Sequence, residues 1–173
     1  MRWLAADDVP SLFAIFGDPE VSRYRLRPPF HSLADAEEML RRVHELFAER
    51  TLFQWGIALR DSDEVVGTAT LLSISPEHAR AELGFALRRD HWRQGLVGEA
   101  MPALLQFAFR TLGLGRLEAD VDPRNTASIR VLERLGFRQE GFLRQRYRVG
   151  GEWQDAAIYG LLRSEWEKGR AAS

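Results

Sequence analysis

The sequence HWRQGLVGEA at His91–Ala100 lies between a strand pattern and a long apolar helix pattern, and it decides the fold of this chain. The strand pattern precedes it at Ala81–Arg88, and the helix pattern continues from Leu96 to Leu112. Glycines in a strand-to-helix turn let several backbone N–H groups point at one place, in front of the positive end of the helix dipole. We therefore predict an anion cradle here, most naturally for a phosphate or pyrophosphate. The alternative is an ordinary connection whose glycines serve only tight backbone geometry.

The residues on either side of this turn predict a mixed sheet flanked by helices. Ser32, with Asp35 three residues on, is close to a capping box, and apolar residues then recur at helical spacing. Alternating apolar residues predict a three-stranded meander before the turn, and Gly150-Gly151 predicts a late hairpin. Expected helices are 7–16, 33–47, 96–112 and 126–135, and expected strands are 53–59, 65–74, 79–88, 117–121, 138–149 and 152–162, after a short or truncated strand at 1–4. We expect one α/β domain over residues 1–173.

Composition and charge exclude several classes of protein. The chain has 173 residues, 45% of them hydrophobic and 28% charged, which is ordinary for one globular domain. A net charge of -1 provides no overall positive field for nucleic acid or an anionic membrane. The absence of cysteine excludes disulfides, thiolate metal sites and a cysteine nucleophile. No apolar run reaches the roughly 20 residues of a membrane span, and no signal peptide is recognisable, so we expect a soluble, cytoplasmic protein.

Several motifs in a fixed order resemble one known family. They are ELGFAL at 82–87, HWRQG at 91–95 followed by Glu99-Ala100, NTAS at 125–128, LGF at 135–137, and Gly141. Together they closely resemble the GCN5-related N-acetyltransferases (GNAT), and the likeness covers nearly the whole chain. The ending DAAIYGLL at 155–162 resembles the ribosomal-protein alanine N-acetyltransferase branch. Trp92 and Val97 depart from the family's usual turn pattern, although Arg93 and Gly98 stand one position later.

The resemblance implies a GNAT fold that uses acetyl-CoA as co-substrate. It implies a mostly antiparallel sheet splayed between the strands at 79–88 and 117–121, with the pantetheine arm paired to the exposed strand edge. A backbone N–H near Leu87 would then bind the acetyl oxygen. The implied cofactor-binding residues are Phe85, Ala86, Leu87, Arg88, Arg93, Gln94, Gly95, Leu96, Val97, Gly98, Asn125, Ser128 and Arg134. Arg89 and Arg130 are further candidates for phosphate contact; the alternative for each arginine is a solvated surface charge.

Two residues are predicted to carry proton transfer, Glu82 as the base and Ser128 as the acid. Strand alternation places Glu82 on one face with Gly84 and Ala86, where small neighbours leave room for an amine. The alternative is that Glu82 only pairs with an arginine such as Arg80.

The resemblance places Ser128 beside the cofactor sulfur and Asn125 on the cofactor arm. The alternative is that Asn125 is only a helix N-cap and Ser128 only a first-turn residue. Tyr147, Tyr159 or water are alternative acids, and Tyr159 is the more typical of a core residue.

The predicted function is transfer of the acetyl group of acetyl-CoA to a primary amine by direct attack in a ternary complex. The acceptor is a protein N-terminal α-amine or, alternatively, a small molecule such as an aminoglycoside, a polyamine or an amino-acid-like metabolite. A non-catalytic acyl-CoA-binding domain is the rival from another class. We expect a monomer or homodimer with no nucleic-acid or membrane partner. We also expect no metal, because the four histidines show no ligand spacing.

Overall fold

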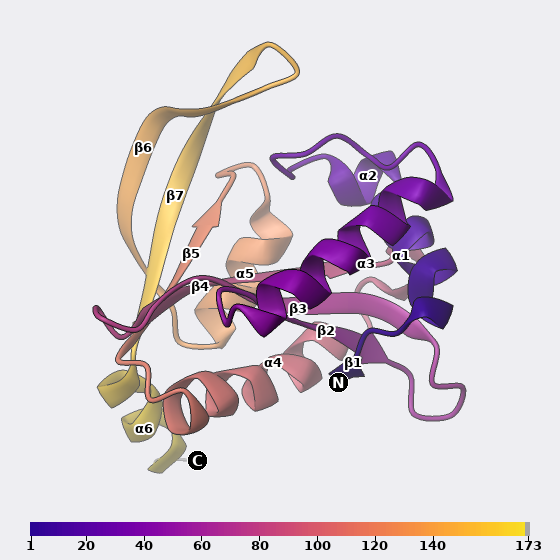
Figure 1. Ribbon diagram of the computed structural model, residues 1–173. Coiled ribbons are helices and arrows are strands. Elements are labelled where there is room, and N and C mark those ends of the chain that lie inside the picture. Colours follow the sequence, from indigo (N-terminus) through magenta and orange to yellow (C-terminus); the bar gives the residue numbers. More distant parts are fainter. Residues whose placement is uncertain (172–173) are drawn as a thin grey trace.

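The computed structural model describes residues 1–171, which fold around a seven-stranded mixed sheet (Figure 1). The strands lie in the order β1-β2-β3-β4-β5-β7-β6, and only the pair β4 and β5 is parallel. Their bounds are β1 Arg2–Trp3, β2 Phe53–Ala58, β3 Val65–Ser75, β4 Arg80–Leu87, β5 Arg116–Val121, β6 Arg138–Val149 and β7 Glu152–Leu162. The predicted mixed, mostly antiparallel sheet is confirmed.

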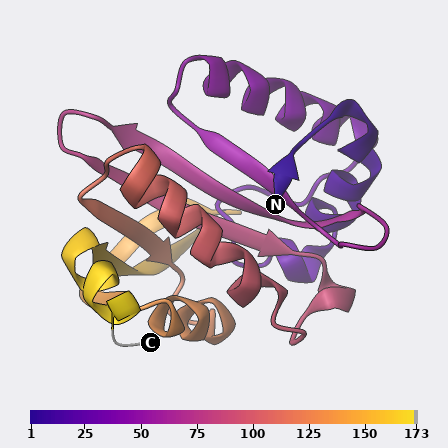
Figure 2. The same cartoon turned by 90° about the horizontal axis from the view of Figure 1, so that it is seen from below.

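Helices cover both faces of this sheet (Figure 2). Helices α1 to α3 lie on one face, where apolar residues such as Leu12, Ile15 and Leu40 form a small buried cluster. Helices α4 and α5 lie on the other face over the larger core, in which Met101 and Leu132 are almost fully buried. The helix bounds are α1 Val9–Phe16, α2 Pro19–Ser22, α3 Leu33–Ala48, α4 Leu96–Gln106, α5 Thr126–Arg134 and α6 Arg163–Ala171. No helix within residues 1–171 is long and apolar enough to cross a membrane.

Local signals in the sequence produce the expected boundaries. The Ser32 N–H donates to Asp35 Oδ2 at 2.9 Å, which is one half of a capping box at the start of α3. The β6–β7 hairpin turns at Gly150 and Gly151, whose φ angles of 59° and 90° are both positive. A type I′ turn requires this conformation at both central residues, and glycine adopts it without a steric cost.

Three features of the helices were not predicted. Asp18 caps the four-residue helix α2 by accepting from the Glu20 N–H at 2.8 Å, but a helix this short shows no periodicity. The last turn of the predicted helix at 96–112 is π-helical, over Phe107–Thr111. Helix α6 is largely polar, and its Trp166 packs against Phe109 of the core with ring centroids 5.2 Å apart.

The sheet opens between its two central strands. β4 and β5 pair only from Arg80 to Glu82 on one strand and from Arg116 to Glu118 on the other. Beyond this point β4 stays paired with β3 and β5 stays paired with β7, so the two strands diverge. The predicted splay between these strands is confirmed, and we call the opening the β4–β5 gap.

Candidate active site

Backbone groups of β4 that pair with no other strand line the β4–β5 gap. The Arg88 N–H donates to the Val66 carbonyl of β3 at 2.7 Å. In a trans peptide the Leu87 carbonyl must then point the opposite way, toward the gap. Alternation along an antiparallel strand sends the N–H groups of Leu87 and Phe85 in the same direction. An extended ligand with amide groups could therefore pair with this edge as an added strand.

The turn before α4 presents free backbone donors beside this edge. Its last residue, Gly95, has a φ of 82° and precedes the helix without any side-chain cap. The first intrahelical bond is from the Glu99 N–H to the Gly95 carbonyl at 3.1 Å, so the N–H groups of residues 96–98 have no intrahelical partner. A Cβ built at Gly95 or at Gly98 would meet nothing within 4 Å. Free donors at the positive end of a helix, below open space, fit a diphosphate.

Side-chain hydrogen bonds hold the turn in shape. The Trp92 indole Nε1 donates to the Leu87 carbonyl at 2.7 Å, and Gln94 Nε2 donates to the Asp90 carbonyl at 3.0 Å. Arg93, between these two residues, has a φ of 62°. A left-handed conformation costs a non-glycine residue roughly 1–2 kcal/mol, so the flanking bonds offset local strain.

The arginines near the turn differ in whether their guanidinium groups already form ion pairs. The Arg88 guanidinium contacts Asp90 at 2.8 Å, Glu64 at 2.5 Å and His91 Nε2 at 2.8 Å. The hydrogen bond with Asp90, followed by that with Glu64, raises the pKa of Arg88. A phosphate would therefore have to compete with two carboxylates for this guanidinium group. Four other arginines are exposed and form no ion pair within residues 1–171: Arg89, Arg93, Arg130 and Arg134.

The start of α5 combines a structural cap with unused polar atoms. Asn125 Oδ1 accepts from the Ser128 N–H at 3.1 Å, so Asn125 is the helix N-cap that its residue type predicts. Within the described residues, the Asn125 amide nitrogen and the Ser128 hydroxyl make no hydrogen bond. Capping thus uses only Oδ1 of Asn125. The Asn125 side-chain amide N–H groups and the Ser128 hydroxyl remain available to donate to a ligand.

The two alternative acids are less suited to proton donation than Ser128. The Tyr147 hydroxyl already donates to Asp120 Oδ2 at 2.6 Å, and burial followed by this bond raises the pKa of Tyr147. Tyr159 is 3% exposed and belongs to the core, as expected, and burial raises its pKa. The Tyr147 proton is thus engaged by Asp120, and Tyr159 lies within the core.

Three carboxylates lie on the sheet face opposite the larger core. Glu82 shares this face of β4 with Gly84 and Ala86, as predicted, and the residues between them are buried or partly buried against the core. Across the parallel pair Glu82 stands beside Glu118, and Asp120 is the next residue on that face of β5. We call Glu82, Glu118 and Asp120 the carboxylate floor. No three acidic or histidine side chains within residues 1–171 approach closely enough to hold a metal ion.

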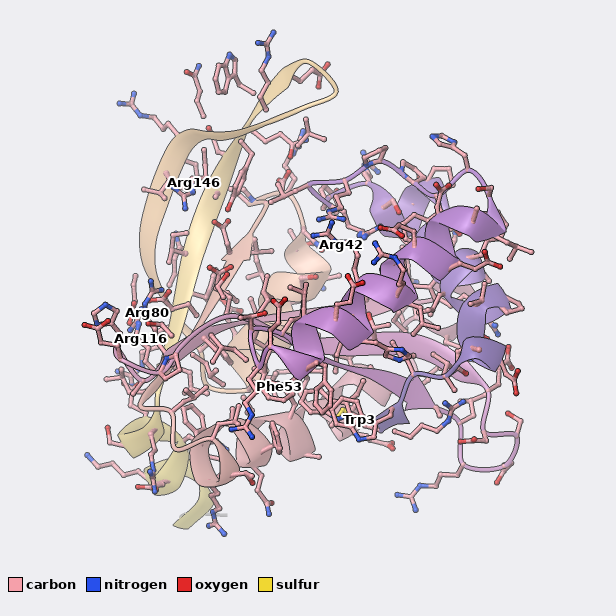
Figure 3. All side chains as sticks on the ribbon, viewed as in Figure 1. Trp3, Arg42, Phe53, Arg80, Arg116 and Arg146 are labelled. Carbon is pink, nitrogen blue, oxygen red and sulfur yellow. The ribbon has the colours of Figure 1, made fainter. Side chains whose placement is uncertain are left out.

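Arginines neutralise two members of the carboxylate floor. Glu118 accepts from Arg80 and from Arg116, each at 2.8 Å, and Figure 3 shows these two arginines together near one end of the sheet. Asp120 lies 3.7 Å from Arg146, farther along the β6–β7 hairpin. The alternative that Glu82 pairs with Arg80 is wrong, because Arg80 extends to the neighbouring strand. Glu82 forms no ion pair within residues 1–171, although its charge acts on Arg146.

Asp120 and its bond with Tyr147 were missed as site features. Polar residues at 116, 118 and 120 alternate with apolar residues at 117, 119 and 121, which does indicate one polar face for β5. The partner of that face, however, comes from β6, which follows only after α5. Trp55 is buried in the larger core, on the opposite face from Glu82.

Comparisons with known proteins agree with this geometry. A family model described as an acetyltransferase (GNAT) domain matches residues 1–138. The chain is 35% identical over 166 residues to the uncharacterized N-acetyltransferase p20 of Bacillus licheniformis, which covers 96% of this chain and 93% of that protein. A GNAT-family acetyltransferase structure from Bacillus anthracis superposes with a TM-score of 0.85 at 25% identity, over 95% of this chain and 94% of that one.

Relatives with named acceptors are more distant. The [ribosomal protein uS5]-alanine N-acetyltransferase of Escherichia coli is 28% identical over 129 residues, 74% of this chain and 66% of that protein. The spermidine N(1)-acetyltransferase of Escherichia coli is 23% identical over 157 residues, 90% of this chain and 81% of that protein. The chain therefore belongs to the GNAT family of acetyltransferases, enzymes that use acetyl-CoA.

Proposed function

We propose that this enzyme transfers the acetyl group of acetyl-CoA to a protein N-terminal α-amine, by direct attack within a ternary complex. One observation carries the proposal: the β4–β5 gap joins the free donors before α4 to the carboxylate floor. A single extended ligand could thus bind its diphosphate at one end and present its acyl group near Glu82. The open space above Gly95 and Gly98 supports the fit of the diphosphate.

The cofactor residues divide by the part of the ligand they would bind. Backbone N–H groups from Arg93 to Gly98, including that of Gln94, would hold the diphosphate. The edge of β4 from Phe85 to Arg88 would pair with the pantetheine arm, which Asn125 would bond from the other side of the gap. Arg93 and Arg134, whose guanidinium groups form no ion pair within residues 1–171, are better placed for phosphate contact than Arg88.

The chain's own groups would move the protons and stabilise the charge. Acetyl-CoA supplies an acetyl group activated as a thioester. Glu82 would take the proton that the amine nitrogen loses as it bonds to the acetyl carbon, directly or through water. The Leu87 N–H would donate to the acetyl oxygen while negative charge develops there. As the C–S bond breaks, its electron pair stays on sulfur, and the Ser128 hydroxyl would donate a proton and regain one from solvent.

The basicity of the amine favours an α-amine as the acceptor. Arginines pair with Glu118 and Asp120, but Arg116 also binds Glu140, so the charge balance of this surface does not select the acceptor. An α-amine has a pKa of about 7.7–8.0, against about 10.4 for lysine, so one carboxylate base is enough to deprotonate it. The distant likeness to the uS5-alanine enzyme supports the same choice.

Release of free CoA over a panel of amines tests the proposal. The panel contains peptides with N-terminal alanine or serine, spermidine, an aminoglycoside and free amino acids. We expect the highest kcat/KM for an unblocked peptide and none for the same peptide with a blocked N-terminus. A higher kcat/KM for spermidine would assign the acceptor to polyamines. Stabilisation by acetyl-CoA without turnover of any amine would indicate a non-catalytic acyl-CoA-binding domain.

A further inference from the structure

We propose that Trp92 is a positioning residue, whose indole N–H couples the diphosphate turn to the strand edge that holds the pantetheine arm. This inference rests on the proposed cofactor site. It concerns one of the two residues, Trp92 and Val97, at which the turn departs from the usual family pattern. The bond in question joins Trp92 Nε1 to the Leu87 carbonyl at 2.7 Å.

The direction of the Leu87 carbonyl gives this bond its meaning. That carbonyl points into the β4–β5 gap, because the Arg88 N–H of the same trans peptide is bonded to Val66 on the other side of β4. It would otherwise be an open acceptor on the last residue of β4. The indole N–H can only donate, and it satisfies this acceptor from within the protein. The added strand of a ligand would therefore find the Leu87 N–H free and the Leu87 carbonyl already bonded once.

The same side chain fixes the spacing between the two parts of the site. Leu87 presents the proposed oxyanion donor, while Trp92 begins the turn whose free N–H groups start at Arg93. Only a single-turn helix, Arg89–His91, lies between them. Without a bond across this segment, the strained Arg93 and the turn could shift relative to the strand edge. Trp92 is 42% exposed, so burial of its ring does not by itself explain the position.

The prediction is a loss of coupling between the two ends of the cofactor. Trp92→Phe keeps an aromatic ring and deletes only the N–H. We expect it to raise the Kd for acetyl-CoA about 3- to 10-fold, which corresponds to one neutral hydrogen bond. The kcat/KM with acetyl-pantetheine, which lacks the diphosphate, should stay within about twofold. The ratio of kcat/KM for acetyl-CoA to that for acetyl-pantetheine should therefore fall by the same 3- to 10-fold.

Two further variants keep the test decisive. Trp153→Phe, at a residue 59% exposed on the β6–β7 hairpin, should leave both kcat/KM values unchanged. Trp92→Leu removes the ring as well as the N–H, and it should match Trp92→Phe. Normal Kd in Trp92→Phe with a loss only in Trp92→Leu would overturn the proposal, because the ring rather than the bond would then matter. Equal losses with both acetyl donors would overturn it too.

The outcome also separates this inference from the proposed function. If the wild-type protein gains no thermal stability from acetyl-CoA, the cofactor site itself is wrong. If acetyl-CoA stabilises the wild-type and Trp92→Phe proteins equally at subsaturating concentration, only the role of Trp92 is wrong. The ligand-free melting temperature of Trp92→Phe should remain close to that of the wild type. If the bond served only to stabilise the fold, its loss would lower this temperature.

Discussion

The two ends of the β4–β5 gap are built in different ways. The turn before α4 consists of backbone N–H groups, one left-handed glycine and open space. The carboxylate floor consists of side chains from β4 and β5, two of them neutralised by arginines that come from β4, β5 and β6. A backbone site depends on conformation and tolerates little change at a few positions. A side-chain site depends on charge balance, so single substitutions there should be graded in effect.

Gly95→Asp should have the largest effect and test the backbone end directly. Wild-type protein should gain about 2.7 kcal/mol of stability at acetyl-CoA a hundredfold above its Kd. Aspartate at Gly95 adds a strained left-handed residue, at φ 82°, and a negative charge at the proposed diphosphate site. We expect the thermal shift with acetyl-CoA to disappear.

Gly113→Asp is the matched control, because Gly113 also has a positive φ (69°) and open space around its Cβ. It should show a similar folding cost and keep the full shift with acetyl-CoA. Equal loss of the shift in both variants would mean that strain, and not the diphosphate site, explains the result.

Glu82→Gln should have the next largest effect, now at the side-chain end. The amide keeps the shape of the carboxylate but cannot accept the proton, so kcat/KM should fall about 100-fold or more near neutral pH. The deficit should shrink as pH rises, since solution then deprotonates the amine, and acetyl-CoA affinity should be unchanged. A pH-rate profile measures this.

Glu118→Gln is the comparison for Glu82→Gln, because Glu118 is neutralised by two arginines. It should lower activity less and leave the shape of the pH profile unchanged. A loss in Glu82→Gln that is the same at every pH would make Glu82 an electrostatic anchor rather than a base.

Ser128→Ala tests the proposed acid at the start of α5. Deleting the hydroxyl should lower kcat by about 10- to 1000-fold. The folding cost should be about 1 kcal/mol or less, because the cap bond is made by the Ser128 N–H and not by its side chain. Thr126→Ala, at an exposed residue in the same first turn of α5, should leave kcat unchanged. A stable Ser128→Ala protein with normal kcat would transfer the acid role to water.

Tyr147→Phe should have the smallest effect of the series. It removes the 2.6 Å bond to Asp120 and leaves Asp120 with Arg146 as its partner. We expect KM for the amine to rise a few-fold, by about one hydrogen bond, with acetyl-CoA affinity and kcat nearly constant. A loss of kcat comparable with that of Ser128→Ala would contradict the argument that the proton of Tyr147 is committed to Asp120.

Most of the fold was predictable because its signals are local. The Ser32 cap, the Gly150-Gly151 turn and the alternation along β4 each depend on neighbouring residues, and the structure shows all of them. The failures have physical causes too. Helix α2 is shorter than one period of any apolar pattern. The partner of Arg80 could not be predicted from β4 alone. It is Glu118 of the parallel neighbour β5, which helix α4 separates from β4 in the sequence.

The sequence by itself determined all the strands, most of the helices, their order and the turn at Gly95. A glycine-bearing strand-to-helix turn owes its donors to backbone conformation, which local residues set. Only the tertiary structure decided how charge is distributed around the β4–β5 gap. Glu118 is bound to Arg80 and Arg116, Asp120 is held by Tyr147, and Glu82 is left without an ion pair within residues 1–171. Ion pairs form between side chains that the sheet brings within a few ångströms, and strand order fixes which these are.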